Sequence, residues 1–177
     1  MTNTDRQDDH QARVRRYYCS FGANLRPKEN ASYALSWLCE QFHRVTLSGV
    51  IATEPEEMVS SLPFINFAFW FDSPLSPQQV KSHFNRQEEK RGRDRSDPLS
   101  SIKDRPLDLD ILSVDRAPTL ATQPDYLVPL LRQLLCNAPL ERETVPILLG
   151  SLKLGDATST IYRDTGTGHI RVVDQHP

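Results

Sequence analysis

Two aspartates, Asp108 and Asp110, stand one residue apart in the alternating segment 107–114 (LDLDILSV). If this segment is a β-strand, residues i and i+2 point to the same face, and the two carboxylates lie side by side. Their repulsion is relieved by a cation, and Mg²⁺ commonly takes one or two carboxylates together with phosphate oxygens. The pattern indicates a metal site for phosphate chemistry. A solvated strand edge is the alternative that the spacing alone leaves open.

The segment before the aspartates, residues 90–106 (KRGRDRSDPLSSIKDRP), is basic and contains glycine and prolines, which predicts a long loop. Cations beside paired carboxylates suit a phosphate chain that protein and metal neutralise together. The cations of this loop include Arg91, Arg93, Arg95, Lys103 and Arg105. A charge run is also typical of a solvated surface, so the loop alone does not decide between the two.

Asn66 interrupts the aromatic and apolar run 64–71 (FINFAFWF), which predicts a central strand. A buried amide must be hydrogen-bonded, and it offers both donors and acceptors. It therefore suits a heterocycle with a mixed edge, such as a guanine or pterin ring. Phe64 lies on the same strand face and is available to stack on that ring. An Asn bonded to the backbone at the edge of the core is the alternative.

The elements that must position these side chains follow from hydrophobic periodicity. Strands are expected over 17–21, 45–53, 64–71 and 107–114, and helices over 28–43, 76–90 and 124–135. Ser76, followed by proline and Gln79, forms a helix-start signature. Strands alternating with helices in a non-repeating order predict an α+β fold, an α/β sandwich.

A chain of 177 residues suits one domain. We expect a polar N-terminal tail over 1–16, the domain over 17–139, and a C-terminal extension over 140–177 that contains a β-hairpin turning at 165–168.

The charge balance and the apolar pattern exclude several classes of protein. A formal charge of -2 argues against bulk nucleic-acid binding, and no apolar run approaches the ~20 residues that cross a bilayer. Three cysteines without metal-type spacing are interpreted as buried free thiols, so we expect a cytoplasmic protein. No P-loop, nucleophile elbow or H-E-x-x-H motif is present.

Five segments carry a resemblance to a known family. They are Phe21-Gly22-Ala23-Asn24-Leu25, Ala52-Thr53-Glu54-Pro55, Pro63-Phe64-Ile65-Asn66, Glu88 with Gly92-Arg93-Asp94-Arg95, and the segment 104–112 (DRPLDLDIL). In this order and near this spacing, over about residues 17–136, they resemble the 6-hydroxymethyl-7,8-dihydropterin pyrophosphokinases of folate synthesis.

The resemblance implies a ferredoxin-like sandwich, with a mostly antiparallel sheet and helices packed on its faces. It also implies the transfer of pyrophosphate from ATP to the hydroxymethyl group of the pterin, leaving AMP. Two Mg²⁺ ions that bridge the ATP phosphates would be held by Asp108 and Asp110.

The resemblance further implies roles for residues of both substrate sites. The pterin would contact Thr53, Phe64 and Asn66, while Glu88, Arg93 and Arg105 fall at family positions near ATP. The basic loop adds Arg95 and Lys103 to the expected nucleotide site. The expected catalytic residues are Arg93, Arg105, Asp108 and Asp110.

The chain departs from the family pattern before its last helix. The family has a Pro-His segment, a basic residue and a second stacking Phe there, whereas residues 116–126 (RAPTLATQPDY) contain no histidine and no later arginine. Two hypotheses stay open. The first is a Mg-dependent pyrophosphokinase, and the second is a catalytically impaired paralogue that binds a pterin or nucleotide as a regulatory or partner protein.

Overall fold

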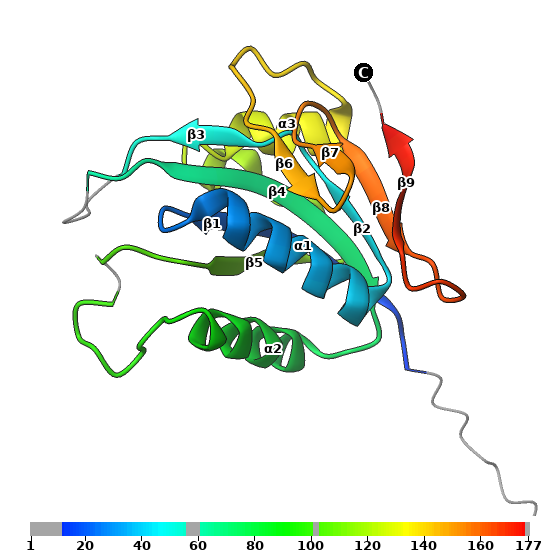
Figure 1. Ribbon diagram of the computed structural model, residues 1–177, viewed down its shortest axis with the longest axis horizontal. Helices are drawn as coiled ribbons and strands as arrows, with labels where there is room; N and C mark the ends of the chain where they lie inside the picture. The colour runs from blue at the N-terminus through cyan, green and yellow to red at the C-terminus, as the bar shows by residue number, and fades with distance from the viewer. Residues whose placement is uncertain (1–11, 56–60, 101–102, 176–177) are drawn as a thin grey trace, which may run out of the picture.

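The computed structural model describes residues 12–55, 61–100 and 103–175 (Figure 1). Its main feature is a seven-stranded sheet in which every pairing is antiparallel. The strands are β1 (Arg15–Ala23), β2 (Arg44–Leu47), β3 (Ile51–Thr53), β4 (Phe64–Ser73), β5 (Asp108–Val114), β8 (Ser159–Arg163) and β9 (Ile170–Gln175). Their order is β5-β1-β4-β2-β8-β9, with β3 also paired to β4. The predicted α+β fold is confirmed, and the arrangement is compatible with a ferredoxin-like sandwich.

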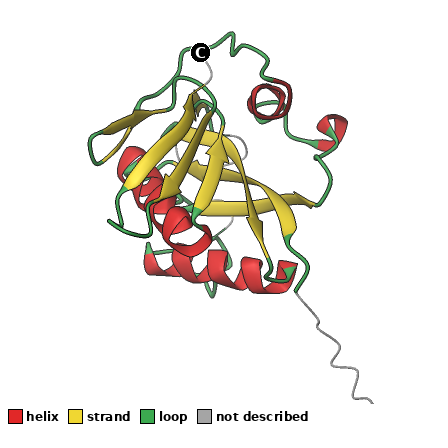
Figure 2. Cartoon of the chain, turned by 90° about the vertical axis from the view of Figure 1, so that its right-hand side faces the viewer, coloured by secondary structure: helices red, strands yellow, loops and turns green. Residues whose placement is uncertain are grey.

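Helices cover the two faces of this sheet unequally (Figure 2). One face packs against α1 (Pro27–Phe42) and α2 (Pro77–Lys90), and Phe67 and Phe69 of β4 point into that core. The other face packs against α3 (Val128–Cys136), which meets Ala68 of β4 in a smaller cluster. We call this second face of the sheet the α3 face. It carries the alternate residues of β4, beginning with Phe64 and Asn66.

The strand expected over 45–53 is divided into β2 and β3 by residues 48–50. The side chain of Gln133 in α3 accepts the Gly49 N–H at 2.6 Å, and Val50 N–H donates to the Gly155 carbonyl. A Cβ on Gly49 would come within 2.6 Å of a Leu140 side-chain carbon. The backbone bends here because α3 and the later chain approach it closely and take its hydrogen bonds.

Residues beyond 140 add strands to the same sheet. Strands β8 and β9 form an antiparallel hairpin, and β8 also pairs with β2. Strands β6 (Ile147–Leu149) and β7 (Leu152–Leu154) form a separate two-stranded sheet that packs into the core beside α1. At the other end of the chain, β1 begins at Arg15, within the segment expected to precede the domain, while residues 1–11 lie outside the described residues.

Two of the three cysteines follow the expectation of buried free thiols. Cys19 and Cys39 are free and fully buried, whereas Cys136 is free and exposed because it is the last residue of α3. None of the helices in the described part of the chain is long and apolar enough to cross a membrane.

The start of α2 carries the predicted capping box. Ser76 Oγ accepts the Gln79 N–H at 3.2 Å, and Gln79 Oε1 accepts the Ser76 N–H at 2.8 Å. We expect Ser76→Ala to lower the free energy of unfolding by about 1 kcal/mol, because a helix N–H loses its partner. Urea denaturation measures this. Ser82→Ala, on the exposed face of the same helix, is the control and is expected to be neutral or slightly stabilising; equal losses in the two variants would contradict the capping role.

Candidate active site

One row of the sheet brings together two groups that are far apart in the sequence. Gly22 of β1 is the register partner of both Asn66 in β4 and Asp108 in β5. Because these residues are directly opposite one another on adjacent strands, they lie on the same face, the α3 face. Asp110 belongs to the next row on that face, opposite Ser20. The expected metal-binding and pterin-binding residues therefore share one surface at the end of the sheet.

Gly22 keeps this surface open. A Cβ at this position would lie 3.0 Å from Asn66 Oδ1 and 3.7 Å from the Phe64 ring. A larger residue would crowd the amide oxygen and require it to shift, so glycine leaves the Asn66 side chain in its place between the two strands. The Gly-Ala-Asn sequence predicts only a turn here. The need for a small residue at position 22 follows from the position of β1 between β4 and β5, which the sequence does not indicate.

The expected pterin-binding residues are adjacent on β3 and β4. Thr53 is the register partner of Phe64, and Asn66 Nδ2 donates to Thr53 Oγ1 at 2.6 Å. Asn66 is 4% exposed, so this bond satisfies one of its buried donors. Its Oδ1 faces the space above Gly22. The three residues form a group with an aromatic ring, a hydroxyl and an amide.

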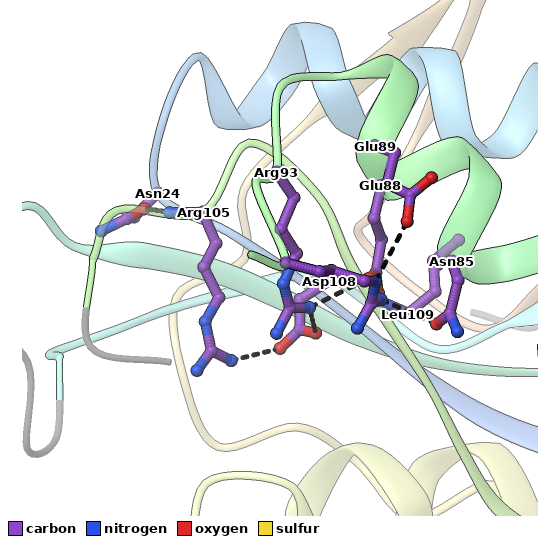
Figure 3. A network of polar contacts seen from close by, with 9 residues as sticks. Asn24, Asn85, Glu88, Glu89, Arg93, Arg105, Asp108 and Leu109 are labelled. Atoms are coloured by element: carbon purple, nitrogen blue, oxygen red, sulfur yellow. Dashed lines mark hydrogen bonds and ion pairs between the residues drawn. The ribbon is translucent and has the colours of Figure 1, made fainter. Parts of the chain in front are cut away.

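A buried carboxylate, Glu88 of α2, links the basic loop to β5 (Figure 3). Its Oε2 accepts Arg93 Nη1 at 2.9 Å, and its Oε1 accepts the Leu109 N–H at 2.9 Å. Arg95 also forms an ion pair with Glu88 and donates to Asn85 at 2.7 Å. Glu88 therefore fixes the start of β5 and two of the expected nucleotide-binding arginines.

The same arginine continues the network to the metal-type carboxylates. Arg93 Nη1 lies 3.1 Å from Asp108 Oδ1, and Arg105 Nη1 lies 2.5 Å from Asp108 Oδ2 (Figure 3). These three side chains are between 15% and 22% exposed, so their charges are only partly screened by water. Each oxygen of Asp108 thus has a cationic partner.

The position of Arg105 depends on Asn24, a residue that the sequence interpretation quoted within a motif but assigned no role. Asn24 Oδ1 accepts the Arg105 N–H at 2.6 Å, its Nδ2 donates to Asp104 at 2.8 Å, and its own N–H donates to the Arg105 carbonyl at 3.0 Å. Asn24 is 3% exposed. A buried amide directly after the first strand was the available signal, because such a group must bind something.

Burial raises the pKa of the Glu88 carboxyl above its ordinary value. The Leu109 N–H lowers it, the negative charge of Asp108 raises it, and Arg93 and Arg95 lower it again. The carboxylate remains a useful anchor because two guanidinium groups and one backbone N–H share its charge.

Asp110 has a different environment from Asp108. Among the described residues, no ion pair to its carboxylate is present, and its pKa is raised, first by desolvation and then by the charge of Asp108. The residue is exposed, yet its neighbours displace enough water to disfavour the charge. A raised pKa beside a second carboxylate is the condition that a cation relieves.

The donor set fits a Mg²⁺ site that a ligand completes. The two aspartates supply hard oxygen atoms on one face, and within the described ranges no group of three or more His, Cys, Asp or Glu could hold a metal by itself. Mg²⁺ often takes one or two carboxylates and fills its remaining positions with water and phosphate oxygens. Asp108 and Asp110 therefore suit an ion that arrives with a phosphate-bearing ligand.

Two expected residues are less closely connected to this centre. Lys103 is 55% exposed and forms an ion pair with Asp97 of the same loop. Arg95 is 36% exposed, and its ion pairs are with Glu88 and Glu89 of α2. Arg91 turns away to α1, where it donates to Asn30 and Glu29.

The sequence also matches a known protein family. Residues 18–143, more than half of the chain, match the family described as 7,8-dihydro-6-hydroxymethylpterin-pyrophosphokinase (HPPK). A search of curated proteins found no match. The matched range contains every residue of the row described above, and it ends before β6.

The raised pKa of Asp110 predicts how stability depends on pH. The folded state holds the Asp110 proton more tightly than the unfolded chain, so this group favours folding below its ordinary pKa of 3.8. That contribution is lost as the pH rises through the folded-state pKa. We therefore expect Asp110→Asn to be more stable than the parent protein at pH 7 and equal to it near pH 3.

Thermal unfolding at the two pH values measures this difference in the absence of divalent cations. Glu141→Gln, which removes one negative charge from an exposed loop residue, is the control and should show no such dependence. A melting temperature of Asp110→Asn at or below that of the parent at pH 7 would contradict the assignment.

Proposed function

The chain belongs to the 7,8-dihydro-6-hydroxymethylpterin-pyrophosphokinase family, and on that premise we propose that it transfers pyrophosphate from ATP to 6-hydroxymethyl-7,8-dihydropterin. The products would be the pterin pyrophosphate and AMP. The observation that carries the proposal is the row Asp108–Gly22–Asn66, which joins metal-type carboxylates and a pterin-type amide on one face. We further propose a cytoplasmic enzyme with ATP and a pterin as its substrates, and without a nucleic-acid or membrane partner.

Asp108 and Asp110 are the residues that would hold two Mg²⁺ ions together with ATP. When bound, such ions supply positive charge that offsets the charge of the phosphate chain. Asp108 lies between the guanidinium groups of Arg93 and Arg105, so it could hold a metal ion only if one of these groups gave up its bond. The N–H donors of Arg93 and Arg105 would suit phosphate oxygens, which guanidinium groups bind well.

We propose that Glu88 belongs to the nucleotide site as a positioning residue. It is 2% exposed, and its oxygens are occupied by Arg93, Arg95 and the Leu109 N–H, so it acts through its neighbours. Arg95 and Lys103 extend the positive charge of the loop toward solvent. There they would attract the phosphate chain and contribute less to its final geometry.

The pterin is proposed to bind at Thr53, Phe64 and Asn66. Asn66 Oδ1 is directed over Gly22 and would accept a ring N–H, while its Nδ2 and the Thr53 hydroxyl provide a second polar position. Phe64 would stack on the ring. This arrangement recognises a heterocycle by both donors and acceptors.

The reaction requires a new bond between the hydroxymethyl oxygen and the β-phosphorus of ATP. The bond from that phosphorus to the oxygen bridging it to the α-phosphorus breaks, AMP leaves with the bridging oxygen, and the hydroxyl proton is lost. No covalent enzyme intermediate is needed. The contribution of this chain is to align the two substrates and to stabilise the developing charge with Arg93 and Arg105.

A second candidate is a paralogue that binds a pterin or nucleotide without transferring pyrophosphate. Both oxygens of Asp108 are engaged by arginines, and the segment 116–126 lacks the family's Pro-His element. A protein that kept this closed ion-pair network with ligand bound would serve as a regulatory or partner subunit. The transfer assay separates the two functions.

We expect purified protein with Mg-ATP and 6-hydroxymethyl-7,8-dihydropterin to form AMP in a pterin-dependent manner. Asp110→Ala should abolish this while circular dichroism remains unchanged, because an exposed carboxylate is removed from a folded strand. AMP is quantified by chromatography, with Glu141→Ala as the exposed-carboxylate control. Full activity of Asp110→Ala would overturn the metal assignment, and no AMP from the parent protein would favour the binding-only function.

We expect Asn66→Ala to weaken pterin binding by roughly 1–3 kcal/mol, because the ring edge loses partners in a desolvated site. Titration calorimetry with the pterin and a non-transferable ATP analogue measures this effect without requiring turnover. Thr46→Ala, a buried hydroxyl substitution elsewhere on the α3 face, is the control for loss of general stability. Equal pterin affinity in Asn66→Ala and the parent would contradict the role of the amide.

A further inference from the structure

A pocket with a volume of about 600 Å³ lies on the α3 face at the opposite end of β4 from Asn66. This volume is within the range of small-molecule sites. Its walls come from β1, β2, β4, β8 and the last turn of α3. The expected catalytic and pterin-binding residues do not line it, and the proposed function does not use it.

The floor of the pocket is built from register partners. Thr46 of β2 is opposite Trp70 of β4 on one side and Thr160 of β8 on the other. The two threonine hydroxyls are 2.9 Å apart and share one hydrogen bond. Each hydroxyl has one proton, so the pair keeps one O–H donor that needs an acceptor from elsewhere.

One cation of the pocket is held rigidly. Arg16 forms a two-point ion pair with Asp72, at 2.8 Å and 2.9 Å, and its guanidinium group lies 3.8 Å from the centre of the Trp70 ring. A guanidinium group has five N–H donors, of which Asp72 takes two, and the Tyr18 hydroxyl also interacts with the group. The remaining donors have a fixed direction because the ion pair and the ring hold the group in place.

A second cation has no such partner. Arg44 lines the pocket and is exposed, and it forms no ion pair with any residue in the described part of the chain. Thr158, also in the lining, is 7% exposed, and its hydroxyl oxygen is buried without a hydrogen-bond partner among those residues. With Asp72 offset by Arg16, the charged side chains of the pocket lining sum to a net positive charge.

The wall opposite the sheet is apolar. It includes Leu134 and Leu135 of α3, beside the Trp70 ring. The Asn137 N–H donates to the Arg132 and Gln133 carbonyls, so part of the negative end of the helix is already satisfied. The pocket therefore combines an apolar wall with a cationic rim.

We propose that this pocket binds a small organic anion: a carboxylate or phosphate group carried on a flat, apolar body. The anionic group is paired with Arg44 and the spare donors of Arg16, and the flat body lies against Leu134, Leu135 and Trp70. Thr158 and Thr160 belong to the chain beyond residue 143, outside the range that matches the family. The site is thus completed by a part of this chain that the family pattern does not include.

The two tryptophans provide a direct test. Trp70 lines the pocket, whereas Trp37 packs against Phe42 and Phe84 in the core on the other face of the sheet. In ¹⁵N-labelled protein, we expect phenyl phosphate or benzoate to shift the indole N–H signal of Trp70 and to leave that of Trp37 in place. Benzamide, which is flat but uncharged, should shift neither.

Substitutions then identify the cation. Arg44→Gln should weaken binding of the responding probe by about fivefold or more, through loss of one charge pair. Arg132→Gln, which removes the same charge from the exposed side of α3 and does not line the pocket, should leave the affinity unchanged. Thr158→Val is a second variant, expected to weaken binding without lowering the melting temperature, because its hydroxyl has no described partner to lose.

The responses to the three probes identify the class of ligand. A response to phenyl phosphate alone assigns a phosphate ligand, a response to benzoate alone assigns a carboxylate, and a response to both supports an anion of either kind. The proposal is overturned if neither anion shifts Trp70, if benzamide binds equally well, or if Arg44→Gln and Arg132→Gln behave alike. The AMP assay is independent of these results, so this proposal and the proposed function fail separately.

Discussion

The buried carboxylate of Glu88 is the interaction on which the rest of the site depends. A charge that is 2% exposed is stable only when partners replace the lost water, and here Arg93, Arg95 and the Leu109 N–H do so. Each partner lies on a different part of the chain from α2, so satisfying one carboxylate fixes both the loop and the start of β5. Asp108 is the first residue of β5, so its position is fixed as well. A long loop with one glycine and two prolines would otherwise have little reason to hold its arginines in one place.

The two aspartates differ in how well their negative charges are balanced by neighbouring groups. Arg93 and Arg105 balance Asp108, whereas the charge of Asp110 is disfavoured by desolvation and by its neighbour, as its raised pKa indicates. The strand pleat places the two carboxylates on one face of the sheet. If only the stability of the fold mattered, a neutral residue at position 110 would be better than an aspartate. We propose that a cation arriving with the ligand relieves this cost, in keeping with the family to which the chain belongs.

Sequence periodicity predicted the strands 64–71 and 107–114 and which of their residues share a face, because alternation depends only on local geometry. It did not predict that Asp108 and Asn66 lie in one row, since this requires Gly22 of a third strand between them. The division of the expected strand at residues 48–50 also depended on a distant partner, Gln133 of α3. Glu88 was placed near the nucleotide by resemblance, while its role as an anchor follows only from its burial. The local hydrophobic pattern therefore predicts the helices and strands, whereas the arrangement of the site depends on pairing between strands that are distant in the sequence.

The helix α3 is too short to cover the whole length of β4 on the α3 face. Strand β4 has 10 residues and α3 has 9, which correspond to about 33 Å of strand and about 14 Å of helix. A helix of this length packs over the middle of the strand around Ala68 and does not extend along its full length, whereas the opposite face is covered by two longer helices, α1 with 16 residues and α2 with 14. The polar residues of β4 on the α3 face lie where the helix does not reach: Asn66 toward one end and Asp72 toward the other. A longer α3 would cover more of this face on either side of Ala68 and would crowd the polar atoms of Asn66 and Asp72, so the short helix leaves room for the two ligand-binding surfaces that we propose on this strand.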